Sequence, residues 1–141
     1  MIRFAAAFAL GLSTFALSAC ASTGEAANQQ TTVSGKIAYR ERIALPPSAQ
    51  IEVRLDDVSL ADAPARNIAR QAFAADGKQV PIAFLLRFDR SAIDPKHSYA
   101  VSARITGDDG KLMFITDTRN SVTFDAGSEI DVGTLNLVKT N

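Results

Sequence analysis

Cysteine and histidine, two residue types common in catalytic and metal sites, each occur only once in this sequence, as Cys20 and His97. A lone cysteine cannot form a disulfide within the chain, and these two residues are too few for a zinc site of the Cys/His type. His97 follows a proline turn, and the sequence assigns it no partner, so we interpret it as a polar turn residue rather than a general base. The pair Asp108–Asp109 supplies only two of the roughly six to eight oxygen ligands that calcium needs. We therefore expect no catalytic residue, no metal and no cofactor.

Cys20 is suited to a different chemistry, the attachment of a lipid. The residues Leu17-Ser18-Ala19-Cys20 resemble the bacterial lipobox, in which an apolar residue and two small residues precede a cysteine. Upstream, Arg3 and the uncharged, mostly apolar stretch Phe4–Ala16 have the composition of a secretory signal. The lipobox resemblance implies a diacylglycerol on the Cys20 sulfur, the most nucleophilic side-chain atom available. It also implies that residues 1–19 are a lipoprotein signal peptide, cleaved between Ala19 and Cys20.

Two alternatives remain for this segment, an uncleaved anchor and ordinary secretion with an incidental cysteine. Phe4–Gly24 carries no charge over 21 residues, which is long enough to span a bilayer.

Lipidation would give a lasting anchor, because each buried methylene contributes roughly 0.8 kcal/mol and three acyl chains supply tens of kcal/mol. In lipoproteins of bacteria with two membranes, an aspartate directly after the lipidated cysteine favours retention in the inner membrane. This chain has Ala21 at that position. The expected location is therefore the outer membrane, with the protein facing the periplasm.

Length and charge limit the remaining possibilities. The chain has 141 residues, which is enough for one domain but not for two ordinary cores. Lys plus Arg and Asp plus Glu both number 15, and this balance argues against nucleic acid as a partner, since phosphate binding needs a basic surplus. Apolar residues make up 47% of the chain, so it is expected to fold.

The mature chain is expected to consist of a tether and one β domain. Residues 20–31 are small and polar, which predicts a lipidated flexible tether of roughly 20 Å root-mean-square span. Over residues 32–141, apolar and polar positions alternate and turn residues separate the runs, as is typical of an all-β domain. The apolar runs lie within residues 33–39, 51–55, 82–88, 99–105, 112–114, 122–124 and 132–137. Seven or eight short strands favour an immunoglobulin-like antiparallel β-sandwich, with a barrel as the alternative.

Two segments of this domain are open to more than one interpretation. Residues 61–75 are rich in alanine and fit a helix or a strand, and we predict a strand over 66–73 because the flanking pattern is β throughout. Asp94-Pro95 followed by Tyr99 is typical of a tyrosine corner, in which the phenol bonds to upstream backbone, although a plain buried core tyrosine fits equally well. Between two runs, Asp108-Asp109-Gly110 predicts a hairpin turn.

Several blocks in a fixed order resemble a known family. These are Ser34–Pro47 (SGKIAYRERIALPP), Gly77–Ile82 (GKQVPI), Ile93–Pro95 (IDP) and Lys111–Thr118 (KLMFITDT). Over roughly residues 33–124 the chain is similar to the YbaY-like lipoproteins, which are grouped with the YscW-type pilotins of type III secretion. The resemblance implies a β-sandwich lipoprotein and, for true pilotins, the delivery of a secretin to the outer membrane. It identifies no residue of this chain as a secretin contact.

Apolar residues on both faces of two predicted strands indicate an interaction surface. Leu85 lies on the opposite face of the predicted strand 82–88 from its apolar run. Met113 and Ile115 likewise lie on the opposite face from Leu112 and Phe114. We predict that these three residues, together with Ile43 and Leu45, dock a protein partner, while a loop or helix covering the second face is the alternative explanation. Five arginines that alternate with apolar strand positions are expected on a solvated outer face beside Glu52 and Asp56. They are Arg40, Arg54, Arg70, Arg87 and Arg104.

The function expected from the sequence is that of a lipid-anchored outer-membrane lipoprotein acting as a non-catalytic binding or assembly module. Its expected partners are the membrane, through the lipid, and an envelope protein. A pilotin-like chaperone for a secretin is one alternative. An envelope glycan-binding module or hydrolase is the other, and a convergent pair of acids in a cleft, or binding to purified peptidoglycan, would support it.

Overall fold

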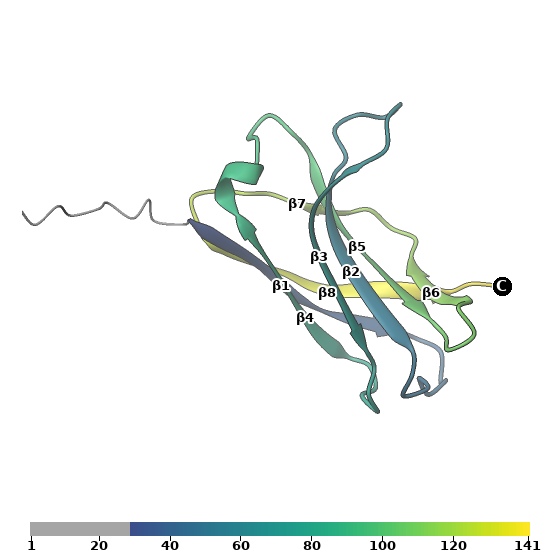
Figure 1. Ribbon diagram of the computed structural model, residues 1–141. Coiled ribbons are helices and arrows are strands. Elements are labelled where there is room, and N and C mark those ends of the chain that lie inside the picture. The colour runs from purple at the N-terminus through teal and green to yellow at the C-terminus, as the bar shows by residue number, and fades with distance from the viewer. Residues whose placement is uncertain (1–28) are drawn as a thin grey trace, which may run out of the picture.

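The computed structural model describes residues 29–141, so the predicted signal peptide, the Ala19–Cys20 cleavage site and the lipidated Cys20 lie outside the described residues. The described chain forms eight strands and one short 3-10 helix (Figure 1). They are β1 (Gln30–Tyr39), β2 (Gln50–Asp57), β3 (Arg66–Ala74), β4 (Ile82–Asp89), η1 (Arg90–Ala92), β5 (Tyr99–Thr106), β6 (Leu112–Thr116), β7 (Asn120–Val122) and β8 (Glu129–Lys139). The all-β prediction is confirmed, and β3 confirms the strand predicted over residues 66–73.

The strands join into one sheet in the order β3-β2-β5-β6-β8-β1-β4, with β7 paired to the start of β5. The short strand β6 pairs with both β5 and β8, and so connects the two halves of the molecule. Pairing is antiparallel except between β1 and β8, which run parallel. The immunoglobulin-like sandwich of two antiparallel sheets is therefore not confirmed.

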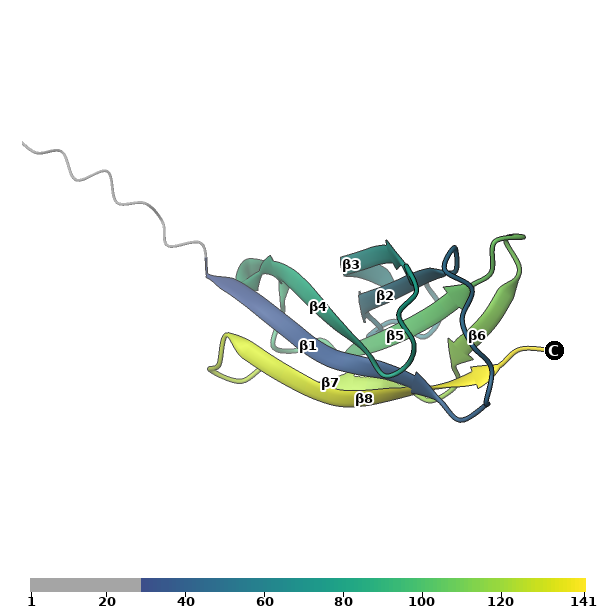
Figure 2. The ribbon, with the colours of Figure 1, turned by 90° about the horizontal axis from the view of Figure 1, so that it is seen from below.

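The sheet curls until its two end strands, β3 and β4, come close together, which gives a nearly closed barrel (Figure 2). At this seam the side chain of Gln71 takes the place of a strand partner, because its Oε1 accepts a hydrogen bond from the Leu85 amide at 2.9 Å. Curling one sheet around a core buries one face of every strand without leaving two open edges far apart.

The core is built from the alternation that the sequence predicted. In β4 every second residue is buried, with Ile82, Phe84, Leu86 and Phe88 inside. Neighbouring strands contribute β-branched and aromatic residues, which favour strands and fill the interior. Aromatic rings pack at both ends of the core: Tyr39 stacks on Phe114 at 4.0 Å between centroids, and Tyr99 meets Phe124 edge to face at 5.3 Å.

The strand directions define two ends of the barrel. The near end is where the chain enters β1 at Gln30, and the strands β2 and β4 finish there. The far end holds the finish of β1 and β8 and the start of β6, with the C-terminus beside it (Figure 1). Ten residues of β1 separate the two ends, or about 33 Å at 3.3 Å per residue. Because β1 begins at Gln30, residues 30 and 31 belong to the sheet rather than to the predicted tether.

Candidate functional site

The single histidine has a partner that the sequence did not reveal. His97 lies in the loop between η1 and β5, and its Nδ1 is 2.6 Å from Asp57 Oδ2 at the end of β2. The two residues are 40 positions apart, and the antiparallel pairing of β2 with β5, in which Asp57 faces Tyr99, brings them together. The other ring nitrogen, Nε2, is 3.9 Å from a second carboxylate, that of Asp94.

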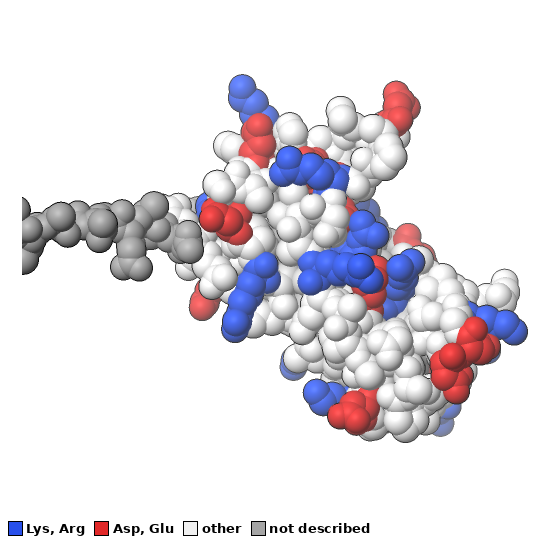
Figure 3. All heavy atoms as spheres, in the orientation of Figure 1, with Lys and Arg blue, Asp and Glu red and all other residues white. Residues whose placement is uncertain are grey.

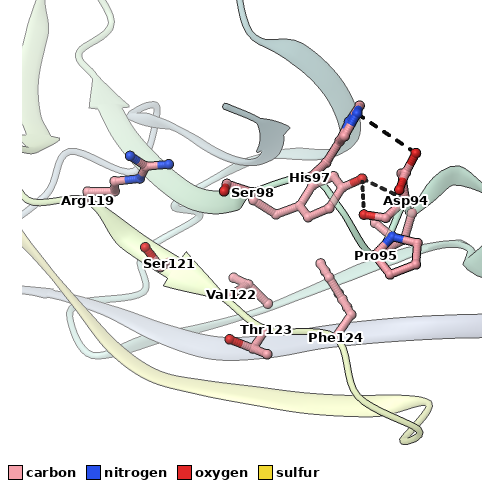
Figure 4. Close-up of a pocket in the computed structure, with 11 residues that line it drawn as sticks. Asp94, Pro95, His97, Ser98, Arg119, Ser121, Val122, Thr123 and Phe124 are labelled. Atoms are coloured by element: carbon pink, nitrogen blue, oxygen red, sulfur yellow. Dashed lines mark hydrogen bonds and ion pairs between the residues drawn. The ribbon is translucent and has the colours of Figure 1, made fainter. Parts of the chain in front are cut away.

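This histidine lies on one side of a shallow polar hollow at the near end. Figure 4 shows His97 beside Asp94, with Arg119 at the opposite side of the hollow and Phe124 at its base. A general base needs a nucleophile or substrate at its free nitrogen, but Nε2 here faces a carboxylate. The arrangement therefore joins the η1–β5 loop to the end of β2 and lacks the geometry of a nucleophilic triad.

Asp57 is held as a carboxylate by several groups at once. The Ser59 hydroxyl donates a hydrogen bond of 2.6 Å to its Oδ1, and the Ser59 amide donates another of 3.0 Å to the same atom. The bond from the Ser59 hydroxyl, with smaller contributions from His97 and the Ser59 amide, lowers the pKa of Asp57 to about 2. At neutral pH this carboxylate connects the β2–β3 loop with the η1–β5 loop.

Acidification is expected to remove this connection. The pKa of Asp57 is lower in the folded chain than the value of about 3.9 in an unfolded one, so its contribution to stability is complete above about pH 4 and is lost as the pH falls towards 2. Asp57→Asn lacks this contribution at every pH. We expect the difference in Tm between wild type and Asp57→Asn to shrink between pH 5 and pH 2 in thermal unfolding followed by circular dichroism.

Asp62→Asn is the matched control, because Asp62 is an exposed carboxylate of the same β2–β3 loop. Its Tm is expected to follow that of the wild type throughout the pH range. A constant difference between wild type and Asp57→Asn from pH 5 to pH 2 would contradict the assignment.

Tyr99 satisfies both interpretations that the sequence left open. Its ring is buried in the core, and its hydroxyl accepts a hydrogen bond of 2.8 Å from the Asp94 amide. The phenol thus bonds to backbone five residues upstream, as in a tyrosine corner. This bond fixes the loop that carries His97.

Only two of the five predicted docking residues lie together. Ile43, 39% exposed, and the half-buried Met113 line an open hollow of about 720 Å³ at the far end of the barrel. Pro46, Leu112 and Phe114 contribute to its apolar lining. Charges of both signs surround it, namely Asp108, Asp109, Lys111 and Lys139. The volume is within the range of ligand and peptide pockets.

The other three predicted docking residues are elsewhere. Leu45 is only 3% exposed, so its prediction as a surface contact is wrong. Its backbone amide and carbonyl both bond to the side chain of Gln79, at 2.8 and 3.1 Å, which holds the segment against the barrel with Leu45 in the core. Leu85 is exposed on β4 at the seam, and Ile115 is exposed on β6 beside Arg104.

Three of the five arginines predicted for an outer face lie together on the outside of β2, β3 and β5, whereas Arg40 follows β1 and Arg87 is exposed on β4. Arg54 pairs with Asp56 at 3.1 Å, and Arg104 pairs with Glu52 at 3.1 Å. Arg70 reaches the same Glu52 from β3. Figure 3 shows basic and acidic atoms intermingled in the middle of this face. The charges are paired as predicted, but Glu52 is only 8% exposed, because the arginines on either side cover it.

Within residues 29–141 no three His, Cys, Asp or Glu side chains are grouped closely enough to hold a metal ion. In the same part of the chain, no helix has the length and apolar character needed to cross a membrane.

Comparison with known proteins identifies the family of this chain. Residues 28–133 match the family described as "Type III secretion system lipoprotein chaperone (YscW)". The chain belongs to this family. The match includes every strand except the end of β8, and it confirms the resemblance predicted from the sequence blocks.

Two relatives extend the comparison. The chain is 43% identical to the "Uncharacterized lipoprotein YbaY" of Escherichia coli K12 over 78% of its own length and 57% of that protein, so it spans little more than half of this curated relative. Among solved structures it is similar to an alternative pilotin from the type II secretion system of Vibrio cholerae, with 49% identity and a TM-score of 0.70. That match covers 79% of this chain and 99% of the pilotin, so the nearly closed barrel is the fold shared by the two proteins.

Proposed function

We propose that this protein is a lipid-anchored, non-catalytic binding module of the bacterial envelope. A lipid on Cys20 would hold it at the outer membrane, facing the periplasm, and a partner protein would bind in the far-end hollow. The observation that carries the proposal is the position of that hollow. It opens at the end of the barrel opposite the point where the chain enters β1, and so would point away from the membrane.

The lining of the hollow favours a protein partner over a glycan. Its floor is aliphatic, and the aromatic ring that contributes to it, Phe114, is 1% exposed and stacked on Tyr39. A glycan is rich in hydroxyl groups, which need hydrogen-bond partners when they are buried. An apolar floor with a rim of both charges instead fits an amphipathic protein segment.

Replacing Ile43 by aspartate is expected to weaken partner binding at least about tenfold, the equivalent of about 1.4 kcal/mol, because a charge would have to be desolvated against the apolar floor. The measurement is co-purification of tagged full-length protein with partners from solubilised native envelope, quantified by mass spectrometry. Ile43 is exposed, so the Tm should remain unchanged.

Leu85→Asp provides the matched control for this experiment. Leu85 is 37% exposed, close to the 39% of Ile43, but lies on β4 outside the hollow. It should retain the partners that Ile43→Asp loses. If Ile43→Asp captures the same proteins in the same amounts as wild type, the far-end hollow is not the binding site.

A secretin is the more specific partner that the comparisons favour. The family description names a secretion lipoprotein chaperone, and the structural relative is a pilotin. In this form of the proposal, the far-end hollow binds a secretin segment and the lipid anchor carries it to the outer membrane. Deletion of the protein in a host that encodes a secretin should leave that secretin outside the outer-membrane fraction. Unchanged secretin localisation would exclude the pilotin role while leaving a different envelope partner.

A further inference from the structure

The β2–β3 loop carries an apolar side chain that the fold does not use. Leu60 is 71% exposed, the highest value among the large hydrophobic residues that the structure describes. Residues 59–65 around it are all exposed and read Ser-Leu-Ala-Asp-Ala-Pro-Ala, so the loop presents small and apolar groups with one carboxylate. A leucine held this far into solvent has no role in the core. Single exposed apolar residues are common on protein surfaces, so what Leu60 contacts depends on where this loop lies in the molecule.

The base of this loop is fixed by hydrogen bonds. The Val58 amide donates to the Ser98 carbonyl at 2.8 Å, and the Ser98 amide donates to the Ser59 hydroxyl at 2.9 Å. Ser59 in turn donates to Asp57 at 2.6 Å. These bonds hold the loop beside the η1–β5 loop, and both rise from the barrel in Figure 1. Leu60 therefore projects from a supported base.

The loop belongs to the end of the barrel where the chain enters β1. Arg66, which follows the loop, donates to the Ala92 carbonyl at 3.2 Å, and Arg90 at the start of η1 donates its amide to the Gln29 carbonyl at 2.9 Å. Nine residues, 21–29, lie between Cys20 and the start of β1, and their full reach is about 30 Å. A lipid on Cys20 would hold this end within that distance of the bilayer.

We infer that Leu60 inserts into the interfacial region of the bilayer that holds the lipid anchor. The inference rests on the lipid anchor of the proposed function. Exposed charges around the loop are balanced, with Arg66 and Lys96 against Asp62 and Asp94, so the contact is apolar rather than electrostatic. The tether makes the contact intramolecular, and burial of one leucine side chain contributes roughly 1.5–3 kcal/mol, so the contact favours one orientation of a barrel that the lipid already holds at the membrane. The insertion orients the barrel with its far-end hollow facing away from the membrane.

The chain contains no tryptophan, so Leu60→Trp introduces a single fluorescent reporter at the loop tip. Leu112→Trp places the same reporter at the far-end hollow, where Leu112 is 38% exposed. Each full-length lipidated variant is reconstituted into phosphatidylcholine vesicles with and without brominated acyl chains. We expect the emission of the Leu60→Trp variant to shift to shorter wavelength and to be quenched severalfold more than that of the Leu112→Trp variant.

Equal quenching at the two positions, or stronger quenching at position 112, would overturn the inference. In the same vesicles, Leu60→Trp protein that consists of residues 21–141, without signal peptide and lipid, should remain unquenched, and quenching equal to that of the tethered protein would show that the tether does not carry the contact. The acyl mass of the intact protein separates the two proposals. Acylated protein without quenching at position 60 overturns the insertion alone, whereas missing acyl mass overturns the anchor and the insertion together.

Discussion

Replacing Gly35 by alanine is expected to lower the free energy of unfolding by about 2–3 kcal/mol, the usual cost of overpacking a filled interior. A Cβ at this position would lie 2.7 Å from the Gly133 carbonyl oxygen, 2.8 Å from Phe84 Cζ and 2.9 Å from Val132 Cγ2. Two of these atoms belong to β8 and one to β4, the strands on either side of β1, so no single neighbour can move aside. Urea denaturation followed by circular dichroism measures the loss.

The cause is a local irregularity in the parallel pairing of β1 with β8. The register shifts between Ser34 and Lys36, and Gly133 opposite has φ of +71°, a backbone conformation that favours glycine. The shift brings the Gly133 carbonyl against the Cα of Gly35. Gly35 is therefore required for its small size, since its own φ is not in the positive range.

Gly127→Ala is the matched control for this prediction. The nearest atom to a Cβ at Gly127 is the Glu129 carbonyl oxygen at 3.7 Å, an ordinary contact, and its φ is not positive. We expect it to change the free energy of unfolding by less than about 0.5 kcal/mol. If the two variants unfold at the same urea concentration, the close approach of β1, β4 and β8 at Gly35 does not limit stability.

The sequence predicted the inside and outside of the strands well, because that information is local. Period-two alternation over residues 82–88 matches the buried and exposed faces of β4, and the flanking β pattern placed β3 correctly despite its alanines. The hairpin at Asp108–Gly110 also follows from local chemistry, since Gly110 has φ of +77°. Each of these features depends on neighbours within a few residues.

The arrangement of the strands was not predictable in the same way. Alternation tells which face of a strand is buried but not which strands pair, so the double pairing of β6 and the parallel β1–β8 pair left no signal in the sequence. The environments of Leu45 and His97 are set by Gln79 and Asp57, which are 34 and 40 residues away. The predicted docking residues were grouped for the same local reason, and the fold distributes them over the far end, the core, the seam and the exposed face of β6.

Replacing Cys20 by serine is expected to abolish lipid attachment and to leave the precursor with its signal peptide uncleaved. A hydroxyl is a much weaker nucleophile than a thiolate, so the thioether cannot form and the lipid-dependent cleavage site is lost. The anchor removed is worth tens of kcal/mol at roughly 0.8 kcal/mol per buried methylene. Intact-protein mass spectrometry and separation of inner-membrane, outer-membrane and soluble fractions measure both effects.

A thiol moved along the chain tests whether the position or only the presence of cysteine matters. In Cys20→Ser combined with Asn28→Cys, the new cysteine follows Glu25-Ala26-Ala27, which lacks the apolar residue of a lipobox. This double variant should behave like Cys20→Ser, without acyl chains and unprocessed. If either variant is processed and fractionates with the outer membrane like wild type, the protein is not held by a lipid on Cys20. The far-end hollow would then have no fixed orientation to the bilayer, and the proposed insertion of Leu60 would lose the tether that brings this leucine to the membrane.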